Sequence, residues 1–423
     1  MNRFGYLLNL AAKSAWNRKS TLVLVVFSIA LSTTLLIGIE RVRFQLRESF
    51  IQAVSGTDLV VGARGSGLQL MLYAIFHMGG ATNNMGWDSA RRIAAINDVD
   101  WAVPISLGDS HKGFPVVATT QSFFTHYRYQ RNKELHFAQG APFAGIFDVV
   151  LGAGVAQKSG YILGEKLTLS HGTGKNTHIE HADKPFAVTG ILAPTGTPVD
   201  NSLYIGLEAM EAIHLDWQGG APMPGFHIQA EQVKKFDLTP KSITALLVGL
   251  KSRARVFAVQ RMINNDTQEA LMGVMPGVAL DQLWEMLNTG ESALLLISWL
   301  VTVTGLAGLV SVILAGLGER RRELAILRSA GASPWDIITL LALEGMILML
   351  TGILAGILIL CALIAALGPV LTARYGIGLH LSPLESKEWV LLGGIVAAGF
   401  LASLIPALCA YRLSLMDGLS VST

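Results

Sequence analysis

The fold of this chain is decided by the stretch Glu319-Arg320-Arg321-Arg322-Glu323-Leu324-Ala325-Ile326-Leu327-Arg328-Ser329-Ala330-Gly331-Ala332-Ser333-Pro334. It lies between two long apolar runs, residues 292–318 and 345–373, and neither run holds a charged residue. A short basic helix between two membrane spans lies at the membrane face, and an excess of Lys and Arg in short loops marks the cytoplasmic side. We therefore expect a coupling element that a cytoplasmic partner can contact.

The composition is that of a membrane protein. Of 423 residues, 51% are hydrophobic and 15% are charged, whereas soluble domains carry about 25% charged residues. The net charge of +2 argues against a nucleic-acid binder, which normally shows a strongly basic patch. The two cysteines, Cys361 and Cys409, both lie in apolar runs, so the long middle segment offers no disulfide or cysteine-based metal site.

Four uncharged runs are long enough to cross a membrane, because about 20 apolar residues span a hydrocarbon core of about 30 Å. We predict an α-helical membrane protein with four transmembrane helices and a large α+β domain inserted between the first and second. The first run is predicted to be an uncleaved anchor. The predicted segments are an amphipathic helix on the cytoplasmic membrane face at 1–19, spans at 20–40, 290–318, 336–368 and 389–411, the outer domain at 41–289, the coupling helix at 319–335, a nearly neutral outer loop at 369–388, and a cytoplasmic tail at 412–423.

The long segment between the first two spans shows mixed secondary-structure signals. Alternating or β-branched apolar residues predict strands, and amphipathic stretches predict helices. The predicted strands are 166–170, 186–192 and 242–250, and the predicted helices are 89–96, 207–213 and 252–264. This order favours an α+β domain.

The sequence contains no nucleotide-binding motif and no catalytic motif. A P-loop needs G-x-x-x-x-G-K-[ST], but Leu169 stands where the first Gly belongs and Asn176 follows Lys175. We therefore predict that the chain is not an enzyme and holds no cofactor of its own, and that ATP and Mg²⁺ are bound by a separate ATPase. Ionisable residues at mid-depth, which ion-coupled transporters usually place in their spans, are also missing from the spans.

A histidine-rich loop is the candidate metal site. His171, His178 and His181 lie close together in the sequence with Glu180 and Asp183. His-x-x-His can supply two ligands to zinc or copper. The alternative is a solvated polar loop between two strands.

The basic helix is the candidate coupling site. The predicted contact residues for an ATPase are Glu319, Arg320, Arg321, Arg322, Glu323, Leu324, Leu327, Arg328 and Ser333. Leu324 and Leu327 form an apolar i, i+3 pair that can insert into a groove of a partner. Gly331 suits a left-handed helix end, and Ser333 suits the N-cap of the next helix. The alternative is a topology signal that binds no partner.

This basic stretch resembles the coupling helix of FtsX-like permeases, the MacB/LolCDE or type VII class of ABC transporter. The C-terminal residues 406–419 resemble the end of that family, although Met416 and Gly418 depart from its usual Pro and Ala. In the middle segment, residues 150–156 and 190–200 also resemble the family.

The resemblance implies a MacB-like periplasmic core domain and a multi-pass chain in the bacterial inner membrane, in contact with its lipid. Two copies would pair as a homodimer, bind cytoplasmic ABC ATPase subunits, and transmit ATP-driven motion to the periplasm for export or extraction of an envelope substrate. A periplasmic binding protein or adaptor is a further candidate partner, and no nucleic acid is expected. Two alternatives remain: a regulator that signals to a periplasmic enzyme, and periplasmic metal handling, since the middle segment also resembles permeases of zinc-linked operons.

Overall fold

The computed structural model describes residues 19–79, 83–130, 132–172, 181–218, 221–223, 228–329, 331–375 and 381–416. They form two compact units. We call residues 46–287 the inserted domain. We call the long helices before and after it, residues 19–45, 288–370 and 381–416, the helical unit.

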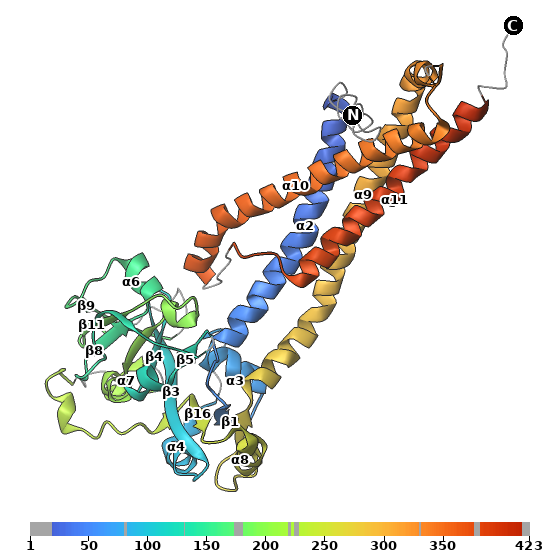
Figure 1. Cartoon of the computed structure of the whole chain (residues 1–423). Coiled ribbons are helices and arrows are strands. Elements are labelled where there is room, and N and C mark those ends of the chain that lie inside the picture. Colours follow the sequence, from blue (N-terminus) through green and yellow to red (C-terminus); the bar gives the residue numbers. More distant parts are fainter. Residues whose placement is uncertain are drawn as a thin grey trace. The chain divides into compact units, whose positions relative to one another are not determined.

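Four long helices supply the candidate membrane spans (Figure 1). They are α2 (Lys19–Gln52), α9 (Pro276–Ser329), α10 (Pro334–Tyr375) and α11 (Ser386–Met416). The apolar portions cover Leu22–Ile51, Pro276–Leu317, Pro334–Leu371 and Ser386–Tyr411, and each exceeds the length that crosses a bilayer. The predicted arrangement of four spans with a domain between the first and second is confirmed.

The helix ends differ from the predicted segment boundaries. The basic part of the predicted coupling helix 319–335 is continuous with the second span, because α9 runs without interruption through the basic stretch to Ser329. Helix α10 extends beyond residue 368 to Tyr375, and α11 begins at Ser386, before the predicted residue 389. The predicted N-terminal amphipathic helix lies almost wholly outside the described residues, as does the end of the tail after Met416.

Small residues bring α2 and α10 close together in the helical unit. A Cβ atom added at Gly352 would lie 2.6 Å from Cγ2 of Ile29, and one added at Gly356 would lie 2.6 Å from the carbonyl oxygen of Ala30. The Thr34 hydroxyl donates a hydrogen bond to the carbonyl of Gly356 at 2.9 Å. Such close backbone approach is how membrane helices gain packing energy where lipid removes the hydrophobic driving force.

The inserted domain is a mixed α/β structure. Its strands are β1 (Leu59–Ala63), β2 (Met85–Gly86), β3 (Val99–His111), β4 (Phe114–Thr119), β5 (Arg128–Tyr129), β6 (Lys133–Glu134), β7 (Phe137–Gly140), β8 (Asp148–Leu151), β9 (Lys166–Leu167), β10 (Ser170–His171), β11 (Phe186–Leu192), β12 (Leu203–Gly206), β13 (Trp217–Gln218), β14 (Ala221–Pro222), β15 (Ser242–Ile243), β16 (Ala245–Leu250) and β17 (Leu271–Val274). Its helices are α3 (Gly67–Ala74), α4 (Trp87–Ala94), α5 (Ser122–His126), α6 (Ala153–Ser159), α7 (Leu207–His214) and α8 (Val256–Asn264), with 3₁₀ turns η1 (Pro198–Asn201), η2 (Val233–Lys235) and η3 (Arg253–Arg255).

One large sheet organises the domain. Its strand order is β17-β1-β16-β3-β4-β12-β8-β11-β7, with β10 paired to β3 and β9 paired to β11. Pairs β4–β12 and β8–β11 are parallel and the other pairs are antiparallel. Strand β3 is the longest and reaches from β16 at one end to β10 at the other, so it carries residues into both halves of the sheet.

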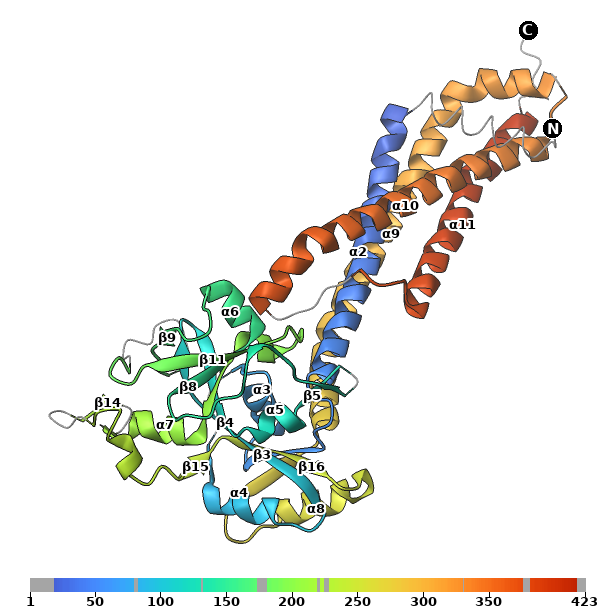
Figure 2. The same cartoon turned by 60° about the vertical axis from the view of Figure 1, so that its left-hand side comes forward.

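Helices cover both faces of this sheet. Alternate residues of a strand point to opposite faces, and accordingly Val60 belongs to one buried cluster while Leu59 and Val61 belong to the other. Helices α3 and α5 pack into the first cluster, and α4, α6, α7 and α8 pack into the second. The domain is thus a sheet with helices packed against both faces; Figure 2 labels α3 and α5, which belong to the first cluster, and α4 and α7, which belong to the second.

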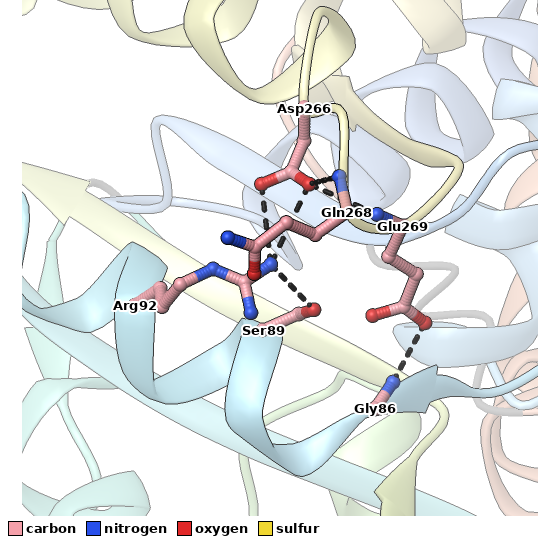
Figure 3. A network of polar contacts seen from close by, with 6 residues as sticks. All are labelled: Gly86, Ser89, Arg92, Asp266, Gln268 and Glu269. Carbon is pink, nitrogen blue, oxygen red and sulfur yellow. Dashed lines mark hydrogen bonds and ion pairs between the residues drawn. The ribbon is translucent and has the colours of Figure 1, made fainter.

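A polar network fastens α4 to the loop that follows α8 (Figure 3). Arg92 contacts Asp266 at 3.3 Å and donates to Ser89 Oγ at 2.9 Å. Asp266 also accepts from the backbone amide of Glu269 at 3.0 Å, and the Glu269 carboxylate accepts from the amide of Gly86 at 2.8 Å. The network joins α4 to this loop through side chains that are partly exposed to solvent.

Most predicted elements of the domain are present, but two strands are divided. The predicted strand 186–192 is β11, and the predicted helix 207–213 is α7. The predicted strand 166–170 becomes β9, which pairs with β11, and β10, which pairs with β3. Likewise 242–250 becomes β15, paired with β2, and β16, paired with β3. In both cases the chain changes its pairing partner within one run of strand-forming residues.

Candidate functional site

The basic stretch forms the last three turns of α9. The helical backbone includes Glu319, Arg320, Arg321, Arg322, Glu323 and Leu324, while the side chains of these residues lie outside what the structure describes. Their predicted contacts with an ATPase therefore stay predictions. The described side chains at this end of the helix begin at Ile326.

Helix α9 ends in a tight turn at Gly331. The amide of Gly331 donates to the carbonyl of Arg328 at 2.9 Å, and the amide of Ala332 donates to the carbonyl of Leu327 at 3.0 Å. These two bonds define a Schellman motif. Gly331 has φ of 94°, which is strained for any residue with a Cβ atom. The predicted left-handed role of Gly331 is confirmed.

The next helix begins immediately after this turn with a reciprocal cap. Ser333 Oγ accepts from the amide of Asp336 at 3.3 Å, and the Asp336 carboxylate accepts from the amide of Ser333 at 2.7 Å. Pro334, the first residue of α10, has the backbone angle that a helix start needs. The predicted N-cap at Ser333 is confirmed. We call residues 326–336, which hold both caps, the α9–α10 junction.

The junction exposes large apolar side chains. Ile326 is 61% exposed and Trp335 is 71% exposed, whereas Leu327 and Arg328 are only partly exposed. Successive residues of a helix point about 100° apart, so Ile326 and Leu327 cannot share one face. Leu327 was predicted from its spacing to Leu324, whereas the exposed residues Ile326 and Trp335 were not predicted, although their apolar character was an available signal.

The second candidate site is a group of polar residues in the inserted domain. His171 and His181, two of the predicted metal-ligand candidates, come together with Asp109 and His214, two residues that the sequence reasoning missed. We call these four residues the histidine cluster. One potential ligand atom from each lies within 4.8 Å of the others. His178 lies outside the described residues.

The sheet and one helix position the histidine cluster. Asp109 on β3 and His171 on β10 are directly paired across the two strands. His214 is the last residue of α7, and its Nδ1 contacts the carbonyl of Met210 at 2.8 Å. The amide of His181 donates to the carbonyl of Leu169 at 2.8 Å, which ties it to the residue before β10.

The electrostatics of the cluster keep a negative carboxylate beside neutral imidazole. Burial of the Asp109 carboxyl opposes its ionisation, but hydrogen bonds from His171 and His214 outweigh that effect and lower its pKa to about 2. Burial lowers the pKa of His181 to about 4. Burial opposes protonation of His214 as well, yet the hydrogen bond to Asp109 raises its pKa above the usual value. At neutral pH the cluster therefore holds an anionic Asp109 and an uncharged His181.

Sequence spacing gave little indication that Asp109 and His214 belong to the histidine cluster. The four cluster residues are spread over more than a hundred positions, and only the pairing of β3 with β10 and the end of α7 join them. One signal was available: Asp is depleted in strands, and Asp109 stands in the long β-forming run 99–111.

Two models of known protein families match this chain. A family model described as the FtsX-like permease C-terminal region matches residues 295–416, and a model of the MacB-like periplasmic core domain matches residues 21–266. The chain belongs to the MacB/FtsX-like permease family. The first match includes the α9–α10 junction, and the second covers most of the inserted domain. The chain is therefore a membrane permease subunit of the kind that works with ATPase partners in ABC systems, and its inserted domain is the periplasmic core domain of the family.

Two solved structures are similar to part of this chain. The extracellular domain of the noncanonic ABC-type transporter YknZ from Gram-positive bacteria is 10% identical, covers 52% of this chain and 99% of its own length, and has a TM-score of 0.30. The periplasmic region of MacB from Actinobacillus actinomycetemcomitans is 10% identical, covers 56% of this chain and 96% of its own length, and has a TM-score of 0.33. No curated protein matches the chain.

Proposed function

We propose that this permease is the membrane subunit of an ABC-type mechanotransmission complex of the bacterial inner membrane. A separate cytoplasmic ATPase would dock at the α9–α10 junction, and the motion that follows ATP binding would reach the inserted domain in the periplasm. There the domain would act on an envelope substrate for export or extraction. The observation that best supports this proposal is the junction. There the C-terminus of the continuous helix α9 and the N-terminus of α10 are both capped.

The junction has the features of a docking surface. The exposed side chains of Ile326 and Trp335 offer apolar area, and exposed apolar groups on a short turn are suited to insertion in a partner's groove. Arg320, Arg321 and Arg322 precede Ile326 in α9, and Trp335 follows at the start of α10. Arginine suits charged contacts at interfaces because its planar guanidinium binds carboxylates through two hydrogen bonds. We therefore add Ile326 and Trp335 to the predicted contact residues.

The capped turn can transmit force without absorbing it. The Schellman bonds at Gly331 and the reciprocal cap at Ser333 satisfy the backbone groups that a helix end would otherwise leave open. A push on the junction is then passed to α9 and α10 instead of unwinding their ends. Helix α9 has 54 residues and is about 80 Å long at 1.5 Å per residue.

A salt bridge joins the first two spans, so that motion of α9 is shared with α2. Arg43 Nε lies 2.6 Å from a carboxylate oxygen of Glu291. Ser32 on α2 also donates to the carbonyl of Val301 on α9 at 3.2 Å. In the proposed complex, two copies of the permease would pair, and the two α2–α9 pairs would tilt when the ATPase subunits close.

Co-purification with the cognate ABC ATPase tests this proposal. We expect the wild-type permease in detergent to retain the ATPase, and we expect Leu324→Asp/Leu327→Asp and Ile326→Asp to lose it. The matched control is Ile162→Asp, which places the same charge at a 63% exposed apolar residue of the inserted domain and should retain the ATPase. Retention of the ATPase by the junction variants at the wild-type level would overturn the proposed docking surface.

A further inference from the structure

We propose that Asp109, His171, His181 and His214 form a binding site for a late first-row divalent cation such as Zn²⁺. The inference goes beyond the proposed function, because neither the docking of an ATPase nor the transmission of motion requires a metal in the inserted domain. It rests on the geometry of the histidine cluster, on its unpartnered buried atoms and on the residues that orient its rings.

The distances within the cluster match the edges of a tetrahedral site. Zinc binds imidazole nitrogen at about 2.0–2.1 Å, and tetrahedral geometry then places neighbouring ligand atoms about 3.3–3.4 Å apart. Asp109 Oδ1 lies 3.1 Å from His171 Nδ1 and 3.6 Å from His214 Nε2. His171 Nδ1 and His214 Nε2 are 3.0 Å apart. Three potential ligand atoms thus already stand at the spacing that one small cation requires, and His181 lies within reach as the fourth ligand.

Buried atoms of the cluster lack hydrogen-bond partners. Among the described residues, the Oδ2 of the fully buried Asp109 has no partner, and neither ring nitrogen of His181 has one although that residue is only 1% exposed. An unsatisfied buried polar group costs roughly 1–3 kcal/mol, so such groups call for a partner. A bound cation would satisfy one nitrogen of His181 and would draw in the free carboxylate oxygen.

The surrounding residues orient the imidazole rings toward a common point. The Nδ1 of His214 donates to the carbonyl of Met210, so Nε2 is the ring nitrogen that faces Asp109. Metal-binding histidines almost always have their second ring nitrogen fixed in this way. Trp217 packs against the His181 ring, with centroids 4.3 Å apart, and against the His171 ring at 5.0 Å.

A buried ion pair holds the segments that carry His181 and Trp217. Lys184, which is fully buried, contacts the two carboxylate oxygens of Asp216 at 2.8 and 3.0 Å. Lys184 follows His181 by one turn, and Asp216 precedes Trp217 directly. The amide of Lys184 also donates to the carbonyl of His181 at 3.2 Å. The position of His181 is therefore fixed by the fold before any ion binds.

The donor set and its exposure indicate which ion can bind. Three imidazoles and one carboxylate suit zinc, copper(II) or nickel, whereas Ca²⁺ and Mg²⁺ prefer oxygen ligands alone. The His171 and His214 side chains are 34% and 25% exposed, so an ion can enter from their side while Asp109 closes the bottom of the site. Four protein ligands make a closed coordination shell, which is typical of a binding site and not of a catalytic metal site.

Zinc titration of the full-length permease tests this site. The chain is purified in detergent, stripped with a chelator, and titrated with Zn²⁺ at neutral pH by calorimetry. We expect one tightly bound zinc per chain and a rise in Tm on binding, since a ligand of the folded state stabilises it. Asp109→Asn and His181→Ala should each weaken zinc binding by about tenfold or more. His136→Ala removes an exposed imidazole of the same domain and should bind zinc as the wild type does.

The test can contradict the proposal in two ways. If the wild-type chain binds no stoichiometric zinc, the cluster is a hydrogen-bonded group of histidines only. If His181→Ala and His136→Ala bind zinc equally well, the zinc lies elsewhere. Asp109→Asn keeps the size of the side chain, so it remains informative if His181→Ala fails to fold. A cobalt(II) spectrum of tetrahedral type in the wild type, lost in Asp109→Asn, would support the proposed ligands directly.

Discussion

A buried ion pair in the helical unit allows a quantitative prediction about the free energy of unfolding. Arg41 on α2 is 7% exposed and Glu388, in the first turn of α11, is 3% exposed. Arg41 Nε and Nη2 donate to the two carboxylate oxygens of Glu388, each at 2.9 Å. The amide of Glu385 donates to the same carboxylate at 2.9 Å, and Arg41 Nη2 reaches the carbonyl of Pro383 at 3.3 Å. Both charges are thus fully enclosed and mutually satisfied.

The variants Arg41→Met and Glu388→Leu each leave one of these charges buried without its partner. Breaking a buried pair in this way costs about 3–5 kcal/mol, whereas replacing both partners by apolar residues of similar size is often neutral. We therefore expect each single variant to lose about 3 kcal/mol or more of unfolding free energy. The double variant Arg41→Met/Glu388→Leu should recover most of that loss, so the coupling energy should be large and favourable.

The assay is denaturant unfolding of the full chain in detergent for all four proteins. Arg47→Met is the control, because Arg47 pairs with Asp281 at 3.4 Å with side chains 49% and 70% exposed. Exposed pairs contribute about 0–1 kcal/mol, so this variant should be nearly neutral. Two results would contradict a stabilising buried pair: Arg41→Met losing no more unfolding free energy than Arg47→Met, or the double variant losing as much as the two single variants together.

Two further predictions concern packing and pH. Gly356→Ala would place a Cβ atom 2.6 Å from the carbonyl oxygen of Ala30, and we expect it to lower the Tm of the full chain. The control is Gly393→Ala, whose new Cβ would have no atom of the described residues within 4 Å, and it should leave the Tm unchanged or raise it. Equal Tm values for the two variants would contradict the close packing of α2 on α10. Burial lowers the pKa of His77 to about 4, so the unfolded chain, in which a histidine has a pKa of about 6.5, binds more protons between these two values. The contribution of His77 to stability is complete above about pH 6.5 and is lost as the pH falls toward 4. His77→Asn, which tolerates the positive φ of this position, should reduce that acid-induced loss in denaturant titrations, and His136→Asn should not; identical pH profiles for His77→Asn and the wild type would contradict the depressed pKa.

Local sequence signals predicted the helices and the junction well. Uncharged runs gave the four spans because a helix must satisfy its own backbone in lipid. Gly331 and Ser333 were predictable because their roles depend on bonds to residues only a few positions away. The family resemblance was carried by contiguous stretches as well: the basic stretch and residues 150–156, 190–200 and 406–419.

Features that depend on tertiary structure could not be predicted in the same way. The charge balance of the outer loop gave no sign that Glu388 would be buried against Arg41, because their contact joins residues at opposite ends of the chain. The histidine cluster has the same origin: His171 was visible in a histidine-rich loop, but Asp109 and His214 reach it only through the pairing of β3 with β10 and the end of α7. The exposure of the Ile326 and Trp335 side chains depends on the direction in which the turn sets the faces of the two helices.

The central claim is that the α9–α10 junction transmits the action of an ATPase to the inserted domain. Hydrogen exchange of the reconstituted permease–ATPase complex, with and without a non-hydrolysable ATP analogue, measures this directly. We expect the nucleotide to change amide protection within residues 46–287, and we expect Ile326→Asp to abolish this change. Unaltered protection of the inserted domain in a complex that binds both ATPase and nucleotide would contradict it.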